Sequence, residues 1–445
     1  MKQLIYIFLV ASCLSTKATV FNCFDASRTA VQSNINLTVN GDTVNVPAGS
    51  ANWTNGLSIT NSISLLGAGT NLTIINYVGN NSSQCINVSC PVGATGGARI
   101  SGFKLLGSSG YTFGTYYVGI ELDSSPYFRT RVDNCWIEQF GMAFNCFAVG
   151  LVDDCTVVQC GRFARVQCPS PEGNWQINEQ IFVRSNWYPA VLDSTNIMDF
   201  ETCHGVWTNY DNIYNVLFSQ QNAGSYMVRH VTFDLHFTTA TPQLFDFHGN
   251  QGNITDPTNM RGGVGLNIYS NVFNCTGTSA TLQFALIRAG AGLIYANTMN
   301  GSVSSADIVF YEEDANGAWS YTGPPYYDQI TNFWIFANTI NSSNSIHVGY
   351  NDTNTQAIYG NGVYWTNIAP SPIITLQYPH PMIGTNVPVP PPQSFTGNLI
   401  TQVSTNLSNS NGWISIFTNH LTNMPSIVAF VATHPKVGFM RQLLK

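Results

Sequence analysis

The sequence predicts an all-β protein built from stacked coils. Only 9% of its 445 residues are charged, whereas globular proteins carry roughly a quarter. The polar surface must therefore come from Asn, Ser, Thr, Gly and Gln, which suit turns and strand faces better than long helices. Short alternating apolar runs recur, and three of them share one pattern: VRHVTF (228–233), LNIYSNVF (266–273) and LIYANT (293–298). Repetition on this scale is typical of a solenoid.

The chain opens with a predicted export signal, residues 1–18. Lys2 precedes an apolar segment that ends at Val10, and small residues follow up to Ala18, which is the pattern of a signal peptide. The run Val10-Ala11-Ser12-Cys13 also resembles a bacterial lipoprotein cleavage box, so lipid anchoring through Cys13 is an alternative to free secretion. No later apolar stretch approaches the ~18 to 20 residues that a membrane span requires. We therefore expect a secreted or cell-surface protein.

Between residues 40 and 75, short strands alternate with Gly, Pro and Asn turns. The segment contains Asp42-Thr43-Val44, Pro47-Ala48-Gly49, Trp53, Leu57-Ser58-Ile59, Gly67-Ala68-Gly69 and Thr73-Ile74-Ile75. These residues resemble the opening of right-handed parallel β-helices of the pectate-lyase-like superfamily. The resemblance implies that fold for the chain.

Two later lines, residues 131–141 and 151–161, superpose at an offset of 20 residues, a plausible length for one coil. The offset places Val132 on Val152, Asp133 on Asp153 and Cys135 on Cys155. Neighbouring coils lie about 4.8 Å apart. The two cysteines are then expected either to pack as an inward apolar stack, which we favour, or to form a disulfide. No Cys-x-x-Cys pair with zinc-like spacing occurs.

A closer likeness is to a group of exported, mostly bacterial β-helix proteins of the same superfamily, whose members are largely uncharacterised. The likeness spans most of residues 40–384, with departures at Ala289, where the group has Gly, and at the last motif, which keeps one His-Pro of two. The residues that carry it are Met227 to Phe233, His248-Gly249, Asn267 to Phe273, Arg288 to Ile294, Asp328-Gln329, Phe336 to Thr339 and Tyr378 to Pro381.

The remaining sequence completes the predicted domain organisation. Residues 306–328 form an acidic and aromatic stretch too irregular for a coil, and the coils are expected to end near residues 376–384. The prediction is a β-helix domain over 19–384, a Pro-rich linker over 385–393 and a C-terminal cap or tail over 394–445.

The candidate catalytic residues lie between the repeated lines. A parallel sheet face presents side chains at coil spacing, which suits an extended sugar chain. Hydrolysis of the chain requires two carboxylates, and lyase action on a uronate requires a base and a cation. Asp246, His248, Arg261 and Arg288 supply these groups if they converge. The alternative is that Arg288 and His248 satisfy backbone carbonyls at coil corners.

A second set resembles part of the polygalacturonase constellation. It consists of Asp153-Asp154, His204-Gly205 and His248-Gly249, without that family's Asn-Thr-Asp and Arg-x-Lys parts. His204 lies 50 residues beyond Asp154, which predicts a separation of more than two coils. We therefore expect Asp153 to be an outward strand residue that repeats Asp133. The pectate-lyase motifs, an Arg-x-Pro after a strand and a Trp-x-Asp-His line, are absent from the sequence.

The acidic and aromatic stretch contributes predicted substrate contacts. Its aromatic residues suit stacking on sugar rings, or else packing of the loop on the barrel side. Its three adjacent acids suit either a solvated loop tip or calcium coordination, so calcium is the alternative to having no cofactor. The aromatic residues are Tyr311, Trp319, Tyr321, Tyr326 and Tyr327, and the acids are Glu312, Glu313 and Asp314.

Composition and resemblance together define the expected function. A net charge of −7 with only 16 Lys and Arg argues against nucleic acid as a partner, because phosphate binding relies on clustered cations. The predicted partner is a polysaccharide or other glycan. The predicted activity is that of a lyase or hydrolase on an acidic polysaccharide, and the alternative is a non-catalytic glycan-binding or structural surface or fibre protein. The fold alone does not choose between them.

Overall fold

The computed structural model describes most of the chain up to residue 383 and three strands beyond it. The described residues are 18–80, 82–89, 96–108, 116–123, 128–167, 197–210, 216–220, 224–248, 265–311, 330–342, 346–350, 365–369, 378–380 and 382–383, with strand positions 398–404, 414–420 and 439–444. The predicted signal segment lies outside them, apart from Ala18.

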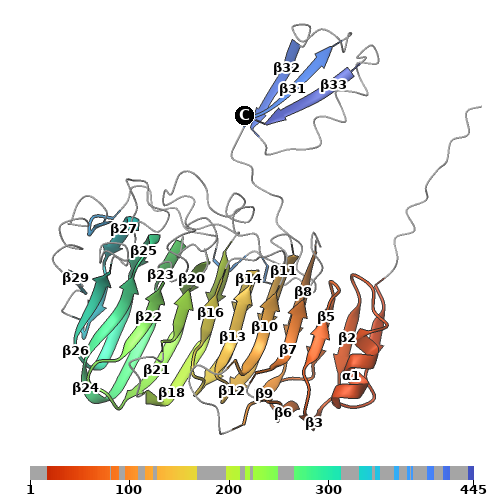
Figure 1. The fold of residues 1–445 in the computed structure, drawn as a ribbon, viewed down its shortest axis with the longest axis horizontal. Coiled ribbons are helices and arrows are strands. Elements are labelled where there is room, and N and C mark those ends of the chain that lie inside the picture. Colours follow the sequence, from red (N-terminus) through yellow and green to blue (C-terminus); the bar gives the residue numbers. More distant parts are fainter. Residues whose placement is uncertain are drawn as a thin grey trace, which may run out of the picture. The chain divides into compact units, whose positions relative to one another are not determined.

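Two long parallel sheets form the first unit, Met1–Val389 (Figure 1). Sheet A has 12 strands. They are β1 Val20–Asn22, β2 Thr43–Val46, β5 Ser64–Gly67, β8 Gly96–Ser101, β11 Phe128–Asp133, β14 Val149–Asp153, β17 Met198–Glu201, β20 Ser225–Arg229, β23 Gly265–Tyr269, β25 Gly290–Tyr295, β27 Ile330–Phe336 and β30 Trp365–Thr366.

The second sheet has 18 strands that fall into two columns, here called B and C. Column B holds β3 Gly49–Trp53, β6 Thr73–Tyr77, β9 Lys104–Leu106, β12 Trp136–Glu138, β15 Thr156–Val158, β18 His204–Tyr210, β21 Thr232–Phe237, β24 Val272–Ile287, β26 Thr298–Phe310 and β28 Thr339–Ile340. Column C holds β4 Leu57–Ile59, β7 Gln84–Ser89, β10 Val118–Asp123, β13 Met142–Phe147, β16 Ala164–Val166, β19 Phe218–Gln220, β22 Gln243–Phe247, the later parts of β24 and β26, and β29 His347–Tyr350.

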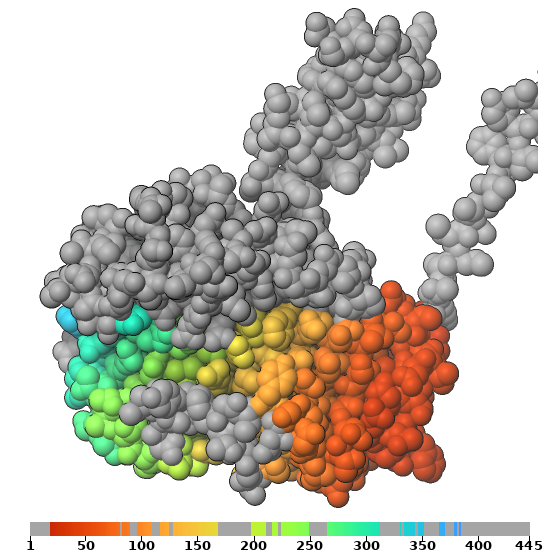
Figure 2. All heavy atoms as spheres, viewed as in Figure 1, coloured from red at the N-terminus to blue at the C-terminus, as the bar shows by residue number. Residues whose placement is uncertain are grey.

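Each coil passes through sheet A, column B and column C before the next coil begins, and Figure 2 shows the coils following one another in chain order. The predicted 20-residue offset is confirmed, because Val132 pairs with Val152 and Asp133 with Asp153. Alternate residues face one core, where Val132 and Val152 are fully buried, as the two-residue period of a strand requires. The predicted right-handed parallel β-helix is confirmed.

The helix α1, Arg28–Ile35, lies at the N-terminal end of this stack, against β2, β3 and β4. Ser27 caps it by accepting a hydrogen bond from the backbone N–H of Ala30 (3.3 Å), a bond typical of an N-cap serine. Val31 and Ile35 turn toward the core. The helix thereby covers the apolar end that the first coil would otherwise expose.

The turn from sheet A to column B repeats in every coil from β11 onward. One residue takes a left-handed conformation, as Asn134 and Asp154 do at φ of 50° and 49°, and the next residue points inward. At that inward position the coils carry in turn Cys135, Cys155, Cys203, Val231, Asn271, Asn297 and Asn338.

The residues at this inward position differ between the earlier and the later coils. Cys135 and Cys155 are buried free thiols, which agrees with the favoured apolar stack and not with a disulfide. The asparagines bond from coil to coil: the side-chain amide of Asn271 donates to Asn297 Oδ1 (3.0 Å), and that of Asn297 donates to Asn338 Oδ1 (2.9 Å). Buried thiols thus occupy this position in the earlier coils, and hydrogen-bonded side-chain amides occupy it in the later ones.

Three long sequence stretches outside the described residues begin at the same corner of the coil. Residues 168–196 follow β16, residues 249–264 follow β22 and residues 312–329 follow β26, each before the next sheet A strand. The predicted irregular stretch was placed too early, because 306–310 belong to β26. The apolar residues Ile308 and Phe310 alternate into the core there, a strand pattern that the neighbouring acidic residues obscure in the sequence.

The second unit, Pro390–Lys445, contains a three-stranded antiparallel sheet of β31 Asn398–Ser404, β32 Ile414–His420 and β33 Phe439–Leu444, in the order β32-β31-β33. The division between the units falls inside the predicted Pro-rich linker 385–393.

Candidate functional site

Three of the four predicted catalytic residues meet at the C-terminal ends of column C strands. Phe245 and Phe247 of β22 are buried in the core, so Asp246 and His248 lie on the opposite, outer side of the column. Phe247 pairs with Ile287, and the backbone N–H of Arg288 donates to the Phe247 carbonyl (3.0 Å). The register therefore places Arg288 beside His248, one coil further along.

The three side chains contact one another directly. His248 Nε2 lies 2.7 Å from Asp246 Oδ2, and Arg288 Nη2 lies 3.3 Å from Asp246 Oδ1. Arg288 Nη1 also lies 3.2 Å from His248 Nδ1. The side chains are 11%, 12% and 15% exposed for Asp246, His248 and Arg288. The carboxylate, imidazole and guanidinium thus form one partly accessible cluster.

The surroundings of Asp246 favour its ionised form. Burial opposes ionisation, but the hydrogen bond from His248 and the nearby positive charges, including Arg288 and Arg162, keep the pKa of Asp246 below its usual value. Ser219 lies opposite Asp246 on β19 and accepts a hydrogen bond from Arg162 (3.0 Å). Burial lowers the pKa of Arg162 to about 10, and Arg165 beside it adds to the effect.

Tyr311 extends the cluster along the axis. It follows the last residue of β26, and its ring centroid lies 5.6 Å from the guanidinium carbon of Arg288. A guanidinium at this distance is attracted by the ring's quadrupole. Tyr311 was predicted to stack on sugar rings, whereas Arg162 and Ser219 were not among the predicted residues. The sequence pattern alone does not identify them, because the stretches between coils differ in length.

No protein-family model matches this sequence. No curated protein matches it either. Among solved structures, the chain is similar to an alginate lyase from Paenibacillus sp. str. FPU-7, at 12% identity, over 75% of this chain and 98% of that one, with a TM-score of 0.44.

The chain is also similar to the catalytic unit of a thermostable GH87 alpha-1,3-glucanase from Streptomyces thermodiastaticus strain HF3-3, at 10% identity, over 80% of this chain and 68% of that one, with a TM-score of 0.40. A third similar structure is ORF18 of Geobacillus virus E2, at 12% identity, over 72% and 54%, with a TM-score of 0.32. The strand register decides the fold. The chain is a parallel β-helix. The three similarities say nothing about its activity.

The other predicted contacts lie outside the described residues. These are Arg261, Trp319, Tyr321, Tyr326 and Tyr327, together with the acids Glu312, Glu313 and Asp314. Their roles stay predictions. Among the described residues, no group of three or more His, Cys, Asp or Glu is placed to hold a metal ion. In the same part of the chain, no helix has the length and apolar character that crossing a membrane requires.

The expected separation of His204 from Asp153 by more than two coils is wrong. β14 pairs directly with β17, and Thr156 of β15 pairs with His204 of β18, so His204 belongs to the very next coil. The extra residues are the 168–196 stretch, which lengthens the chain without adding a coil. His204 nevertheless bonds to Asp234 through Nε2 (2.7 Å) and not to Asp153.

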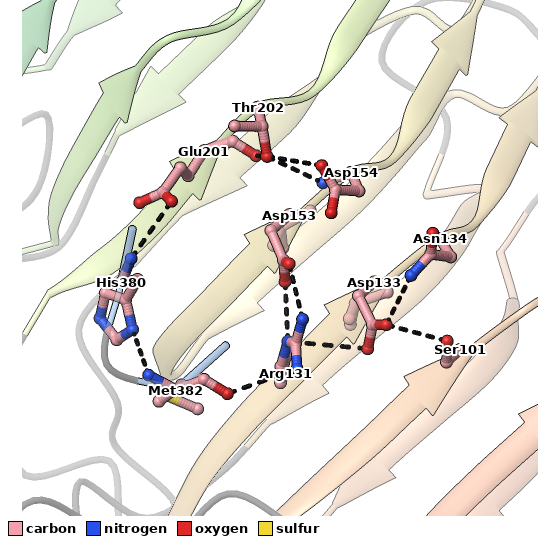
Figure 3. A network of polar contacts seen from close by, with 12 residues as sticks. Ser101, Arg131, Asp133, Asn134, Asp153, Asp154, Glu201, Thr202, His380 and Met382 are labelled. Atoms are coloured by element: carbon pink, nitrogen blue, oxygen red, sulfur yellow. Dashed lines mark hydrogen bonds and ion pairs between the residues drawn. The ribbon is translucent and has the colours of Figure 1, made fainter. Parts of the chain in front are cut away.

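Asp153 is an outward residue of sheet A, as expected, but it is fully buried. Figure 3 shows it facing Arg131. Arg131 donates to both of its oxygens, at 2.9 and 2.7 Å, and Arg99 holds Asp133 in the same way at 2.7 Å for each bond. Burial raises the pKa of Asp153 to about 6 against the effect of Arg131. Bidentate pairing of this kind positions both carboxylates as structural partners of arginines.

The residues that cover this network come from near the end of the first unit, in the return segment, residues 378–380 and 382–383. The backbone N–H of His380 donates to Glu201 Oε1 (3.2 Å), and the Met382 carbonyl accepts from Arg131 (3.3 Å). Tyr378 packs on His230, with centroids 4.0 Å apart. The expected end of the coils near residues 376–384 stays a prediction. The residues described there lie across sheet A.

Proposed function

We propose that this protein is an exported enzyme that cleaves an acidic polysaccharide by β-elimination at Asp246, His248 and Arg288. The observation that carries the proposal is the contact of one imidazole with both a carboxylate and a guanidinium in a partly exposed cluster. A uronate lyase requires a base for the proton at C5 and a cation for the charge that develops on the substrate carboxylate.

The roles follow from the geometry of the cluster. Asp246 accepts a hydrogen bond from His248 Nε2 and so orients the imidazole, whose Nδ1 is the proton acceptor. Arg288 binds the carboxylate of the sugar ring and stabilises the enolate-like transition state. The C5–H electron pair becomes the C4–C5 double bond, the C4–O bond breaks toward the glycosidic oxygen, and that oxygen takes a proton from water. The imidazolium then gives the C5 proton to the hydroxide left by that water, which regenerates neutral imidazole.

Hydrolysis is the second candidate, and the position of the carboxylates favours elimination. A hydrolase needs two carboxyl groups about 5 to 10 Å apart. Among the described residues on the outer side of column C, the acid nearest to Asp246 is Asp307, two strands away and two residues out of register, or about 12 Å at the usual strand spacing and rise. Glu312, Glu313 and Asp314, which lie outside the described residues, are candidates for a second carboxylate.

The charge around the cluster supports an acidic substrate. Arg162, Arg165 and Arg288 lie on or beside described column C strands within two coils of Asp246, where the other described acid is Asp307. Arginine recognises carboxylates through paired, charge-assisted hydrogen bonds. We assign Trp319, Tyr321, Tyr326 and Tyr327 to sugar stacking within the same proposal, with calcium bound at the acidic stretch as an optional aid.

A polysaccharide panel tests the proposal. The mature protein is incubated with polyuronates and with neutral glycans, and both the ultraviolet absorbance of unsaturated products and the release of reducing ends are followed. We expect unsaturated products from a polyuronate alone. Reducing ends without unsaturation would indicate a hydrolase. No cleavage together with binding on a glycan array would indicate a non-catalytic glycan-binding protein and refute the proposal.

Variants then connect the activity to the cluster. His248→Gln should lower kcat/KM by about 10² to 10⁴, the usual contribution of a positioned general base. Asp246→Asn should lower it as well, because the imidazole loses its ionised partner. His236→Gln is the matched control, since His236 lies on β21 of column B and bonds to Thr276 Oγ1 (3.1 Å). An active His248→Gln enzyme with wild-type kinetics would contradict these roles.

A further inference from the structure

The contacts of His248 determine which of its nitrogens carries a proton. A neutral imidazole has one N–H donor and one lone-pair acceptor, whereas a guanidinium has donors only and a carboxylate has acceptors only. Nε2 faces the Asp246 carboxylate at 2.7 Å, so Nε2 carries the hydrogen. Nδ1 faces Arg288 Nη1 at 3.2 Å, so Nδ1 presents its lone pair to a donor.

The basic nitrogen of His248 is therefore covered. Nδ1 is the only atom of the imidazole that can accept a proton in this tautomer, and its lone pair already accepts a hydrogen bond from the Arg288 guanidinium. Protonation of Nδ1 would place an N–H against another N–H and a positive charge against a guanidinium. In the arrangement described here, His248 cannot act as a base until Arg288 moves.

We propose that Arg288 is a specificity-determining gate, which a carboxylate-bearing sugar opens by drawing the guanidinium away from His248. This inference rests on the proposed function and adds to it how the enzyme distinguishes uronates from neutral sugars. A hydrogen bond from arginine to a carboxylate is charge-assisted and can be bidentate, and such bonds are roughly twice as strong as those to neutral acceptors. A uronate therefore competes well for Arg288, and a neutral sugar does not.

The contacts of Arg288 suit a group that exchanges partners. Its contact with Asp246 is long, at 3.3 Å, and Tyr311 provides an aromatic surface 5.6 Å from the guanidinium carbon. The guanidinium can slide over such a surface without losing its favourable contact with the ring. The same movement frees Nδ1 and brings the cation to the substrate carboxylate, so base and electrophile become available together.

Chemical modification of His248 tests the gate without relying on turnover. Diethyl pyrocarbonate acylates an imidazole nitrogen through its lone pair, and the extent at each histidine is read by peptide mass spectrometry. We expect wild-type His248 to react slowly and Arg288→Met to raise its rate about tenfold, as the loss of one capping hydrogen bond would. Arg288→Lys, which keeps a cationic donor, should stay close to wild type. His236 in the same sample is the internal control.

A ligand arm keeps the test decisive if Arg288→Met folds poorly. Free glucuronate added to the wild-type protein should speed modification of His248, and glucose at the same concentration should leave it unchanged. Equal rates with and without glucuronate, or an Arg288→Met rate equal to wild type in a folded protein, would overturn the gate. A wild-type protein without lyase activity on the polyuronate panel would instead refute the proposed function, whatever the modification rates are.

Discussion

Replacing Asn297 by Ala tests whether the hydrogen bonds among the inward residues Asn271, Asn297 and Asn338 stabilise the later coils. The Asn297 side chain is fully buried and takes part in four hydrogen bonds. Its amide donates to the Ile268 carbonyl and to Asn338 Oδ1, both at 2.9 Å, and its oxygen accepts from the Asn271 backbone at 3.2 Å and side chain at 3.0 Å. Alanine removes all four and leaves polar groups buried.

The expected loss is large. Four buried hydrogen bonds at about 1 kcal/mol each amount to about 4 kcal/mol, a substantial part of the 5 to 15 kcal/mol that typically separates folded from unfolded states. Urea unfolding followed by tryptophan fluorescence measures the change. Asn45→Ala is the matched control, because the exposed Asn45 amide makes one bond to Asn22 (2.9 Å), and it should cost less than about 0.5 kcal/mol. A fall in the free energy of unfolding of less than about 1 kcal/mol for Asn297→Ala would refute this stabilising role of the three asparagines.

Three further predictions concern the charge network on sheet A and the cysteines. Arg131→Met should lower the free energy of unfolding by about 3 to 5 kcal/mol at neutral pH, because it leaves Asp153 as a buried unpaired charge. The loss should be smaller near pH 5, where Asp153 can take up a proton. Urea unfolding at the two pH values measures both losses, and equal losses would contradict the role of the Asp153 charge. Burial and the charges of Arg229, Arg129 and Arg131 lower the pKa of His380 to about 3 from 6.5. Neutral His380 therefore stabilises the fold fully above about pH 6.5, and this contribution is lost as the pH falls toward 3. His380→Asn should make the unfolding free energy fall less steeply over that pH range, and an unchanged slope would show that His380 is not the titrating group. The thiols of Cys135 and Cys155 should resist maleimide labelling until the chain unfolds. The pKa of Cys135 is raised by its hydrogen bond to Cys155 and by burial, and the pKa of Cys155 is raised by burial. Mass spectrometry measures the labelling, and a protein 2 Da lighter without labelled thiols would reveal a disulfide instead.

The sequence predicted those features that recur once per coil. The pairing of Val132 with Val152, the inward position of Cys135 and Cys155 and the strand lines around Asn271 and Asn297 all repeat at a nearly constant spacing. The convergence of Asp246, His248 and Arg288 was predictable for the same reason, because each residue ends or follows a repeated strand line.

The features that the sequence did not predict depend on chain stretches without a period. His204 seemed remote from Asp153 because residues 168–196 intervene, although the strands on either side pair directly. Arg162 contributes to the cluster across those same residues. The return segment carries His380 back to sheet A from 179 residues beyond Glu201, and no local pattern records which surface such a segment will cover.

The shared corner from which the long insertions start has a consequence for how such a protein can change. The coils before and after each insertion complete each other's hydrogen bonds, as β14 does with β17 and β20 with β23. An insertion can therefore be lengthened, shortened or exchanged with a relative's without shifting the register of any strand. The length and sequence of these stretches can then vary while the hydrogen bonds of the scaffold stay the same.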